Sequence, residues 1–253
     1  MTVARRVQQE PAWLLHHRPF RDSSQILDIL SRDHGRLAVV ARGSRGAKSK
    51  LRGILRPFLP LQLSWVIRSD LGTLTGAEMD GAPLSLTGDA LLSGYYVNEL
   101  ILKLLHRHDP QPEIFSVYST TIERLSSSEN IALHLRQFEI ELLRMLGYAL
   151  NLDHDTESHK PLRPQQQYEY RAEQGPVPVQ DREGPMIFTG LELAAIRKQE
   201  FGETAILKRA GTLLRNVIAY HLDGKELLSR KVLREMRRHR LYRQDITEIE
   251  RDY

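Results

Sequence analysis

The first eighty residues of the chain alternate between short apolar runs and turn-forming residues. In one of these runs Leu61, Leu63 and Trp65 alternate with Gln62 and Ser64, a pattern typical of a strand with one face in a core and the other in water. Runs of similar length, each bounded by Pro, Gly, Asp or Ser, cover residues 12–17, 24–30, 36–42 and 72–79. Five strands within about seventy residues predict a small antiparallel barrel.

After Pro83 the apolar period changes to that of a helix. The stretches with helical spacing are residues 90–108, 112–127, 131–148 and 203–222. Gly147 is a helix stop near the end of the third stretch. We therefore predict that the second part of the chain is mostly helical.

Residues 151–185 interrupt this helical pattern. They are polar, rich in Gln and Pro, and have no helical period, which predicts a loop or a small hairpin inserted between helices. The predicted fold class is α+β, with a small antiparallel barrel in residues 1–81 and a mostly helical domain in residues 82–253.

The composition agrees with two soluble units. A chain of 253 residues with 41% hydrophobic residues can bury a core, and its length suits two domains. It has no N-terminal apolar segment and no apolar run long enough to cross a bilayer, so we expect neither export nor a membrane. The absence of cysteine excludes disulfides, thiolate catalysis and thiolate metal sites, and favours the cytoplasm.

The net charge of +4 conceals opposing blocks of charge. Residues 1–80 carry 13 Lys and Arg against 7 Asp and Glu, whereas residues 81–206 carry 11 against 18. Residues 207–243 are basic again, with 11 against 3, and the last ten residues carry 1 against 4. Such blocks indicate a surface with two positive regions rather than a uniformly basic protein.

The densest basic segment is residues 41–58, ARGSRGAKSKLRGILRPF, which has three glycines and no carboxylate. A nucleotide-binding P-loop is excluded because that motif requires Gly directly before Lys-Ser, where this chain has Ala47. Since small barrels commonly bind oligonucleotides through cationic grooves, we favour nucleic-acid contact over an ordinary solvated loop. The glycines predict a mobile loop that binds phosphates independently of base sequence.

The candidate contact residues are Arg36, Arg42, Arg45, Lys48, Lys50, Arg52 and Arg56. A second-choice basic site comprises Arg230, Lys231, Arg234, Arg237 and Arg238.

Other candidate sites are weaker. Trp13, Phe20 and Trp65 are possible stacking surfaces, although aromatic residues at alternating strand positions more often belong to the core. The His and Asp residues at 106–109 and 153–159 form no complete tetrahedral set, so no metal site is expected. The chain has no recognisable nucleophile motif or acid–base pair, and we do not expect an enzyme.

Four longer motifs follow one another between Ala12 and Leu233: AWLLHHRPFRDSSQILDILSRDHGRLAVVARGSR, LRPFLPLQLSW, LSGYYVNELILKLL and LRQFEIELLRMLGY. Together they resemble the RecO family of bacterial recombination mediators. The resemblance implies an N-terminal OB-fold barrel followed by a helical domain, which matches the architecture that the periodicity predicts.

The resemblance also implies a non-catalytic DNA repair protein without a cofactor. Members bind single- and double-stranded DNA, anneal complementary strands, engage the acidic tail of the single-strand-binding protein SSB, and work with RecR to load RecA. A cationic loop would then neutralise two phosphate backbones at once, so that bases can search for register. The alternative is an RNA-binding OB-fold protein associated with translation, which would prefer RNA and ignore SSB.

The chain departs from its apparent family in the insertion. Many relatives carry four cysteines there as a zinc site, whereas NLDHDTESHKPLRPQQQYEY has none. Zinc is therefore not expected, and packing and hydrogen bonds alone must hold the insertion.

The stretch 131–148 contains the candidate site for the SSB tail. Its apolar face is formed by Leu135, Phe138, Leu142 and Leu146. Arg136 lies at the edge of this face, where it suits a peptide ending in acidic residues and a Phe. The resemblance of LRQFE to the family motif supports Arg136 and Phe138, with Arg215 as a second cation. The alternative is that the apolar face is ordinary core and the arginines are solvated or paired with Glu139 or Glu141.

Overall fold

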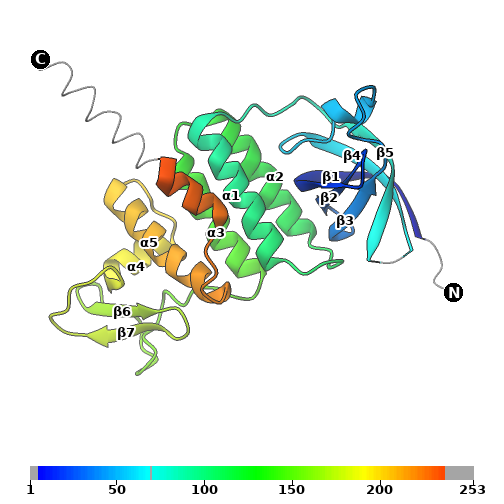
Figure 1. The fold of residues 1–253 in the computed structure, drawn as a ribbon. Helices are drawn as coiled ribbons and strands as arrows, with labels where there is room; N and C mark the ends of the chain where they lie inside the picture. Colours follow the sequence, from blue (N-terminus) through cyan, green and yellow to red (C-terminus); the bar gives the residue numbers. More distant parts are fainter. Residues whose placement is uncertain (1–4, 69, 237–253) are drawn as a thin grey trace, which may run out of the picture.

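The computed structural model describes residues 5–68 and 70–236 and begins with a closed five-stranded barrel (Figure 1). Its strands are β1 (Arg5–Phe20), β2 (Ser24–Ser31), β3 (Gly35–Ala41), β4 (Pro60–Ile67) and β5 (Leu71–Met79). They are hydrogen-bonded in the order β1-β2-β3-β5-β4, and β1 closes the barrel by also pairing with β4. Only the β3–β5 pair is parallel among these strands. The predicted barrel is confirmed.

Strand β1 is longer than the sequence pattern predicts. It begins at Arg5 rather than near Ala12, and its register shifts between Val7 and Glu10 and again between Leu14 and His16. Such irregularities bend a strand, which allows β1 to pair with two neighbours around the barrel. The shifts also break the apolar alternation, so the first residues of β1 do not look like a strand in the sequence.

Alternate residues of the strands fill the barrel. Leu27, Ile29, Leu37 and Val39 are completely buried there, and Trp65 on β4 lies among them at 0% exposure. Trp65 is therefore a core residue and offers no ring surface to a nucleic acid.

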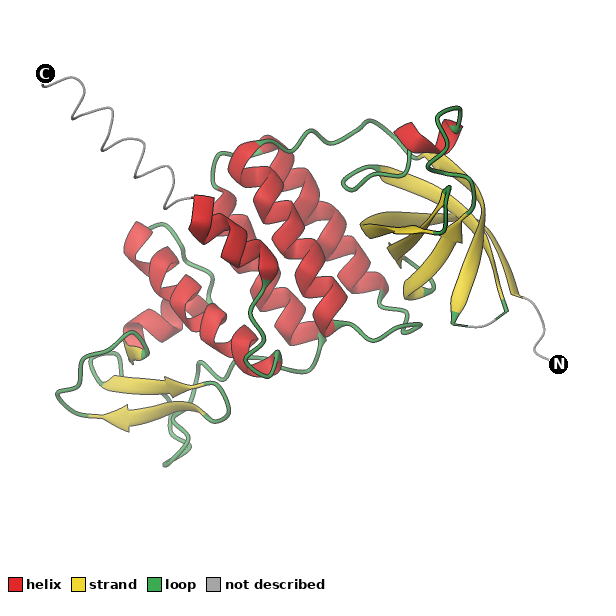
Figure 2. Cartoon of the chain, viewed as in Figure 1, coloured by secondary structure: helices red, strands yellow, loops and turns green. Residues whose placement is uncertain are grey.

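Helices follow the barrel (Figure 2). They are α1 (Gly88–Leu104), α2 (Pro112–Ser127), α3 (Ile131–Met145), α4 (Gly190–Arg197) and α5 (Thr204–His221), and residues 228–236 are also helical. The four predicted helices are confirmed. Helix α4 was not predicted, although its capping box of Thr189 and Glu192 is a local signal for a helix start. Among the described residues, no helix is both long and apolar enough to span a bilayer.

The polar insertion forms a small antiparallel sheet. Strands β6 (Gln167–Arg171) and β7 (Gly175–Val179) make a hairpin, and β8 (Ile187–Thr189) pairs with the other edge of β6. The hairpin alternative of the prediction is the one observed. Tyr168 and Phe188 of this sheet are buried in the same hydrophobic core as the helices.

The barrel and the helices share one hydrophobic core. Trp13, Leu15 and Leu30 lie on the outer surface of the barrel and belong to the apolar cluster that α1 to α5 bury. Polar groups are satisfied across the same boundary, because Asn98 Nδ2 of α1 donates to Leu15 O at 2.8 Å and Trp13 Nε1 donates to Ser119 Oγ at 2.8 Å. The barrel is therefore packed rigidly against the helices.

Candidate nucleic-acid interface

The segment between β3 and β4, residues 42–59, projects from one end of the barrel (Figure 1). Its six exposed cations are Arg42, Arg45, Lys48, Lys50, Arg52 and Arg56, which we call the basic loop cations. None of them forms an ion pair with a carboxylate anywhere in residues 5–68 or 70–236. Six uncompensated positive charges on one loop create a field that attracts polyanions.

The basic loop is folded into successive turns, and the mobility that its glycines predict stays a prediction. Ser44 Oγ donates to Ala41 O at 2.8 Å, Gly46 N to Gly43 O at 3.2 Å, and the 3₁₀ helix η1 (Lys50–Gly53) follows. Leu55 and Phe58 are buried, at 4% and 5% exposure. The loop holds its cations outward because these apolar residues attach its second half to the protein.

Arg36 differs from the basic loop cations. Its guanidinium is half-buried and donates from Nε and Nη2 to the carbonyl oxygen of Leu105, at 3.1 and 2.9 Å. Burial and the nearby positive charge of Arg107 lower the pKa of Arg36. Arg36 thus fastens the barrel to the end of α1, and we leave it out of the DNA-contacting set.

Of the three candidate stacking residues, Trp13 and Trp65 are buried and Phe20 is half-buried. Trp13 is 4% exposed at the boundary between barrel and helices, where its ring meets Tyr118 edge-on at 5.6 Å. Phe20 packs against a small buried cluster that includes Ile26 and Val40. The apolar spacing of residues 90–108 predicts a buried Tyr95 on α1, and this is wrong, because Tyr95 is 44% exposed and contacts Phe58 of the basic loop.

Each of the two segments with candidate His and Asp ligands has a residue with a structural contact, Arg107 in residues 106–109 and Asp155 in residues 153–159. Arg107 and Asp28 form an ion pair at 3.4 Å, and the Asp155 carboxylate closes a turn by accepting hydrogen bonds from the backbone and hydroxyl of Ser158. Hydrogen bonds from Ser158 hold the pKa of Asp155 below its ordinary value. In the described part of the chain, no three His, Asp or Glu residues are grouped as metal ligands.

Arg136 and Arg215 lie close together, with Arg230 beside them, and Arg136 is paired with Glu139, as the alternative interpretation of this helix expects. Arg136 Nη2 donates to Glu139 Oε1 at 2.7 Å, and Arg230 Nη2 lies 3.8 Å from the same oxygen. Partial burial, followed by the charges of Arg230 and Arg136, lowers the pKa of Arg215. These residues form an arginine cluster of Arg136, Arg215 and Arg230 around the single buried carboxylate of Glu139.

The buried Tyr96 hydroxyl contacts both Glu139 and Arg230 of the arginine cluster. Burial and the adjacent Glu139 carboxylate raise the pKa of Tyr96, so its hydroxyl remains protonated and donates to Glu139 Oε1 at 2.5 Å. Arg230 Nη2 in turn donates to the Tyr96 hydroxyl oxygen at 2.6 Å. Three guanidinium groups against one carboxylate leave the cluster with an excess of positive charge.

Phe138 lies apart from the arginine cluster. It is 1% exposed and lines a cavity of about 280 Å³ between α2 and α3, together with Arg124, His134 and Gln137. Arg136 points instead toward α5, where its Nη1 lies 2.5 Å from the position of a Cβ placed on Gly211. The structure therefore does not unite Arg136 and Phe138 in one groove, and Phe138 is a core side chain.

The second basic segment is only partly described. Lys231 is exposed, Arg230 is half-buried in the arginine cluster, and Arg234 pairs with Glu226 at 2.7 Å. Arg237 and Arg238 lie outside the described residues.

Comparisons with known proteins identify the same two parts of the chain. Residues 5–81 match the family model described as "Recombination protein O N terminal", and residues 85–231 match "Recombination protein O C terminal". The chain is similar to proteins named "DNA repair protein RecO" from three organisms. It is 40% identical to that of Aromatoleum aromaticum, over 93% of this chain and 99% of the relative. It is 39% identical to that of Methylococcus capsulatus, over 90% and 94% of the two chains, and 41% identical to that of Burkholderia orbicola, over 90% and 82%. The chain therefore belongs to the RecO family of DNA repair and recombination proteins.

Proposed function

We propose that this chain is a non-catalytic recombination mediator. It binds single- and double-stranded DNA, anneals complementary strands, and works with RecR to load RecA onto SSB-coated DNA in the nucleoid. The observation that carries the proposal is the set of six exposed loop cations without an ion pair among the described residues. Family membership favours DNA repair over the RNA-binding alternative.

The basic loop suits annealing because annealing joins two polyanions. Complementary strands repel each other until cations neutralise their phosphates, and the neutralising side chains must not lock the bases in place. Long Lys and Arg side chains on a short loop meet both requirements, since they contact phosphates and leave base edges free to pair. This step needs neither a cofactor nor a metal.

The first experiment replaces Arg42, Arg45, Lys48 and Lys50 with Ala and measures DNA affinity as a function of salt. Because this variant neutralises about four fewer phosphates, the slope of log K against log salt for single strands becomes shallower by about 3, at roughly 0.7 per phosphate. Affinity falls alike for all sequences because phosphates carry no base identity.

A matched control removes the same charge elsewhere. Arg163, Arg182, Lys198 and Lys208 are exposed cations of the helical part, and their replacement with Ala is expected to leave the slope close to that of the wild type. An unchanged slope in the loop variant would move the DNA site to the second basic segment, residues 230–238.

We further propose that the arginine cluster binds the acidic tail of SSB. Its excess of guanidinium groups over carboxylates suits a segment with several carboxylates, and Arg forks bind carboxylates with two parallel hydrogen bonds. The exposed Arg215 is the point at which a peptide reaches the cluster from solvent. The site predicted from the sequence also included Phe138, but the proposed site does not, because Phe138 is buried.

The tail proposal is tested by charge reversal. Arg136→Glu and Arg215→Glu are expected to abolish binding of an isolated SSB tail peptide in a fluorescence anisotropy titration, while naked strands still anneal. The control is Arg144→Glu, because Arg144 is an exposed arginine on the same helix as Arg136. This variant is expected to keep the wild-type affinity for the tail peptide. Tail affinity within about threefold of the wild type, roughly 0.7 kcal/mol, in both cluster variants would place the tail elsewhere.

A further inference from the structure

An exposed aromatic ring lies directly beside the basic loop. Between Ala90 and Asn98 of α1, Tyr95 is the only exposed residue, with 44% of its surface open to solvent. Its hydroxyl makes no hydrogen bond to any residue that the structure describes. The neighbours of Tyr95 on this stretch of α1 are buried or half-buried, so its ring is the part of the stretch most open to a ligand.

The contact between Tyr95 and the loop depends on Gly94 of α1, which has no side chain. A Cβ placed on Gly94 would lie only 2.8 Å from Phe58 Cζ, so the absence of a side chain at this position lets the Phe58 ring rest on the helix. Phe58 has a φ of 64°, a left-handed conformation that is uncommon for a residue with a side chain. The rings of Phe58 and Tyr95 then meet edge-on, with centroids 5.2 Å apart.

This contact brings Tyr95 near a positively charged residue of the loop. Arg56, one of the basic loop cations, precedes Phe58 by two residues, so their Cα atoms are at most about 7 Å apart. The exposed ring of Tyr95, from the helical part, and the backbone of Arg56, from the barrel loop, thus lie close together. Proteins that bind single strands combine these two elements, a cationic track for phosphates and aromatic rings for bases.

We propose that Tyr95 stacks on an unpaired base of single-stranded DNA whose phosphates lie on the basic loop. The inference rests on the proposed function, because the loop has to hold the strand. It adds a contact that discriminates between single and double strands, since a paired base inside a duplex is already stacked on its neighbours. The cations attract both forms of DNA, and Tyr95 favours the unpaired one.

The test compares Tyr95→Leu with Tyr95→Phe on DNA strands with and without bases. An abasic strand of equal length has the same phosphates, so the preference of the protein for the normal strand measures base contacts alone. Tyr95→Leu is expected to reduce this preference about fivefold or more, because one stacked base contributes at least that factor. Tyr95→Phe retains the ring and the preference.

Two controls separate stacking from other effects. Tyr220→Leu removes a tyrosine that is 48% exposed on α5, a helix on the far side of the helical part from the barrel, and leaves the preference unchanged (Figure 1). Duplex affinity and the salt slope of Tyr95→Leu stay at the wild-type level, since every phosphate keeps its cation. In Tyr95→Trp, the indole fluorescence is quenched by single strands and not by duplexes.

The experiments can disprove base stacking by Tyr95 and phosphate binding by the loop independently of each other. If the loop variant has a shallower salt slope while Tyr95→Leu keeps the full base preference, the stacking is wrong and the loop site stands. If Tyr95→Leu weakens binding to duplexes and abasic strands as much as to normal strands, the ring only supports the loop, and the proposal is overturned. An unchanged slope in the loop variant contradicts the loop site itself.

Discussion

At the level of single residues, Glu99 shows how one carboxylate docks a helix. Its oxygens accept hydrogen bonds from Leu228 N and Ser229 N, each at 2.9 Å, and from Ser229 Oγ at 2.6 Å. Glu99 therefore caps the start of the helical residues 228–236 from another helix. Burial by itself raises the pKa of Glu99, but the hydrogen bonds from Ser229 and Leu228, with the charge of Lys103, outweigh it and lower the pKa.

This lowered pKa predicts an acid-sensitive contribution to stability. A carboxyl group whose folded pKa lies below its unfolded value stabilises the protein above the unfolded pKa, and loses this effect as pH falls through the folded pKa. Glu99→Gln is expected to cost about 1 kcal/mol of unfolding free energy at pH 7, the usual value of a cap. The difference from the wild type disappears well below pH 4.5, the ordinary value for Glu.

Urea unfolding at a series of pH values measures this difference. Glu173→Gln is the control, because Glu173 is exposed in the turn between β6 and β7 and lies at no helix end, and it is expected to track the wild type at every pH. A cost of Glu99→Gln that is the same at pH 3 and pH 7 would contradict the capping role.

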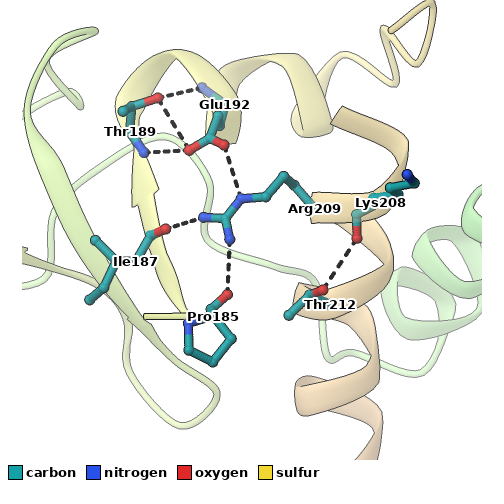
Figure 3. A network of polar contacts seen from close by, with 7 residues as sticks. All are labelled: Pro185, Ile187, Thr189, Glu192, Lys208, Arg209 and Thr212. Atoms are coloured by element: carbon teal, nitrogen blue, oxygen red, sulfur yellow. Dashed lines mark hydrogen bonds and ion pairs between the residues drawn. The ribbon is translucent and has the colours of Figure 1, made fainter. Parts of the chain in front are cut away.

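At the level of helices and strands, Arg209 of α5 holds the small sheet in place (Figure 3). Its guanidinium donates to Glu192 Oε1 at 2.9 Å, to Pro185 O at 3.1 Å and to Ile187 O, and lies 4.0 Å from the centre of the Phe188 ring. These contacts join α4, α5 and β8 at one point. In a sheet of three short strands without cysteine, such a contact has the role of a cross-link.

Replacing Arg209 with Met keeps the apolar stem and removes the charged hydrogen bonds. We expect a loss of about 2 kcal/mol of unfolding free energy, because the acceptors are partly buried and the bonds are charge-assisted. Hydrogen exchange is expected to accelerate in residues 167–189 and to remain slow in α1. The matched control is Arg182→Met, which replaces an exposed arginine of the same insertion. If residues 167–189 exchange equally fast in the two variants, the cross-linking role of Arg209 is wrong.

In the molecule as a whole, barrel and helices form one body. Gly35 of the barrel lies so close to the helical part that a Cβ there would overlap Asp109 O, and Arg36 binds Leu105 O beside it. The basic loop and the arginine cluster are therefore held at a constant separation. A DNA strand on the loop is within reach of α1 without any rearrangement, which is why the proposed interface includes a residue of the helical part.

Much of the fold was predictable because it depends on local pattern. The four long helices and four of the strands follow from apolar spacing, which records the face that each element buries. The start of β1 was missed because its bulges break the alternation, and α4 was missed because eight residues carry little periodicity. For the insertion the sequence predicts a loop or a hairpin without deciding between them, since Pro and Gln favour neither.

The order of residues alone is enough to predict a barrel, a helical part and a loop with six cations and no carboxylate. Which of the charges remain available follows only from the folded chain. Arg36 is engaged by Leu105 O and Arg136 by Glu139, whereas the basic loop cations have no ion-pair partner in the described chain. Folding likewise buries Trp65 and leaves Tyr95 exposed. The reason is that composition and spacing act locally, whereas burial and pairing depend on residues that are distant in sequence and adjacent only after folding.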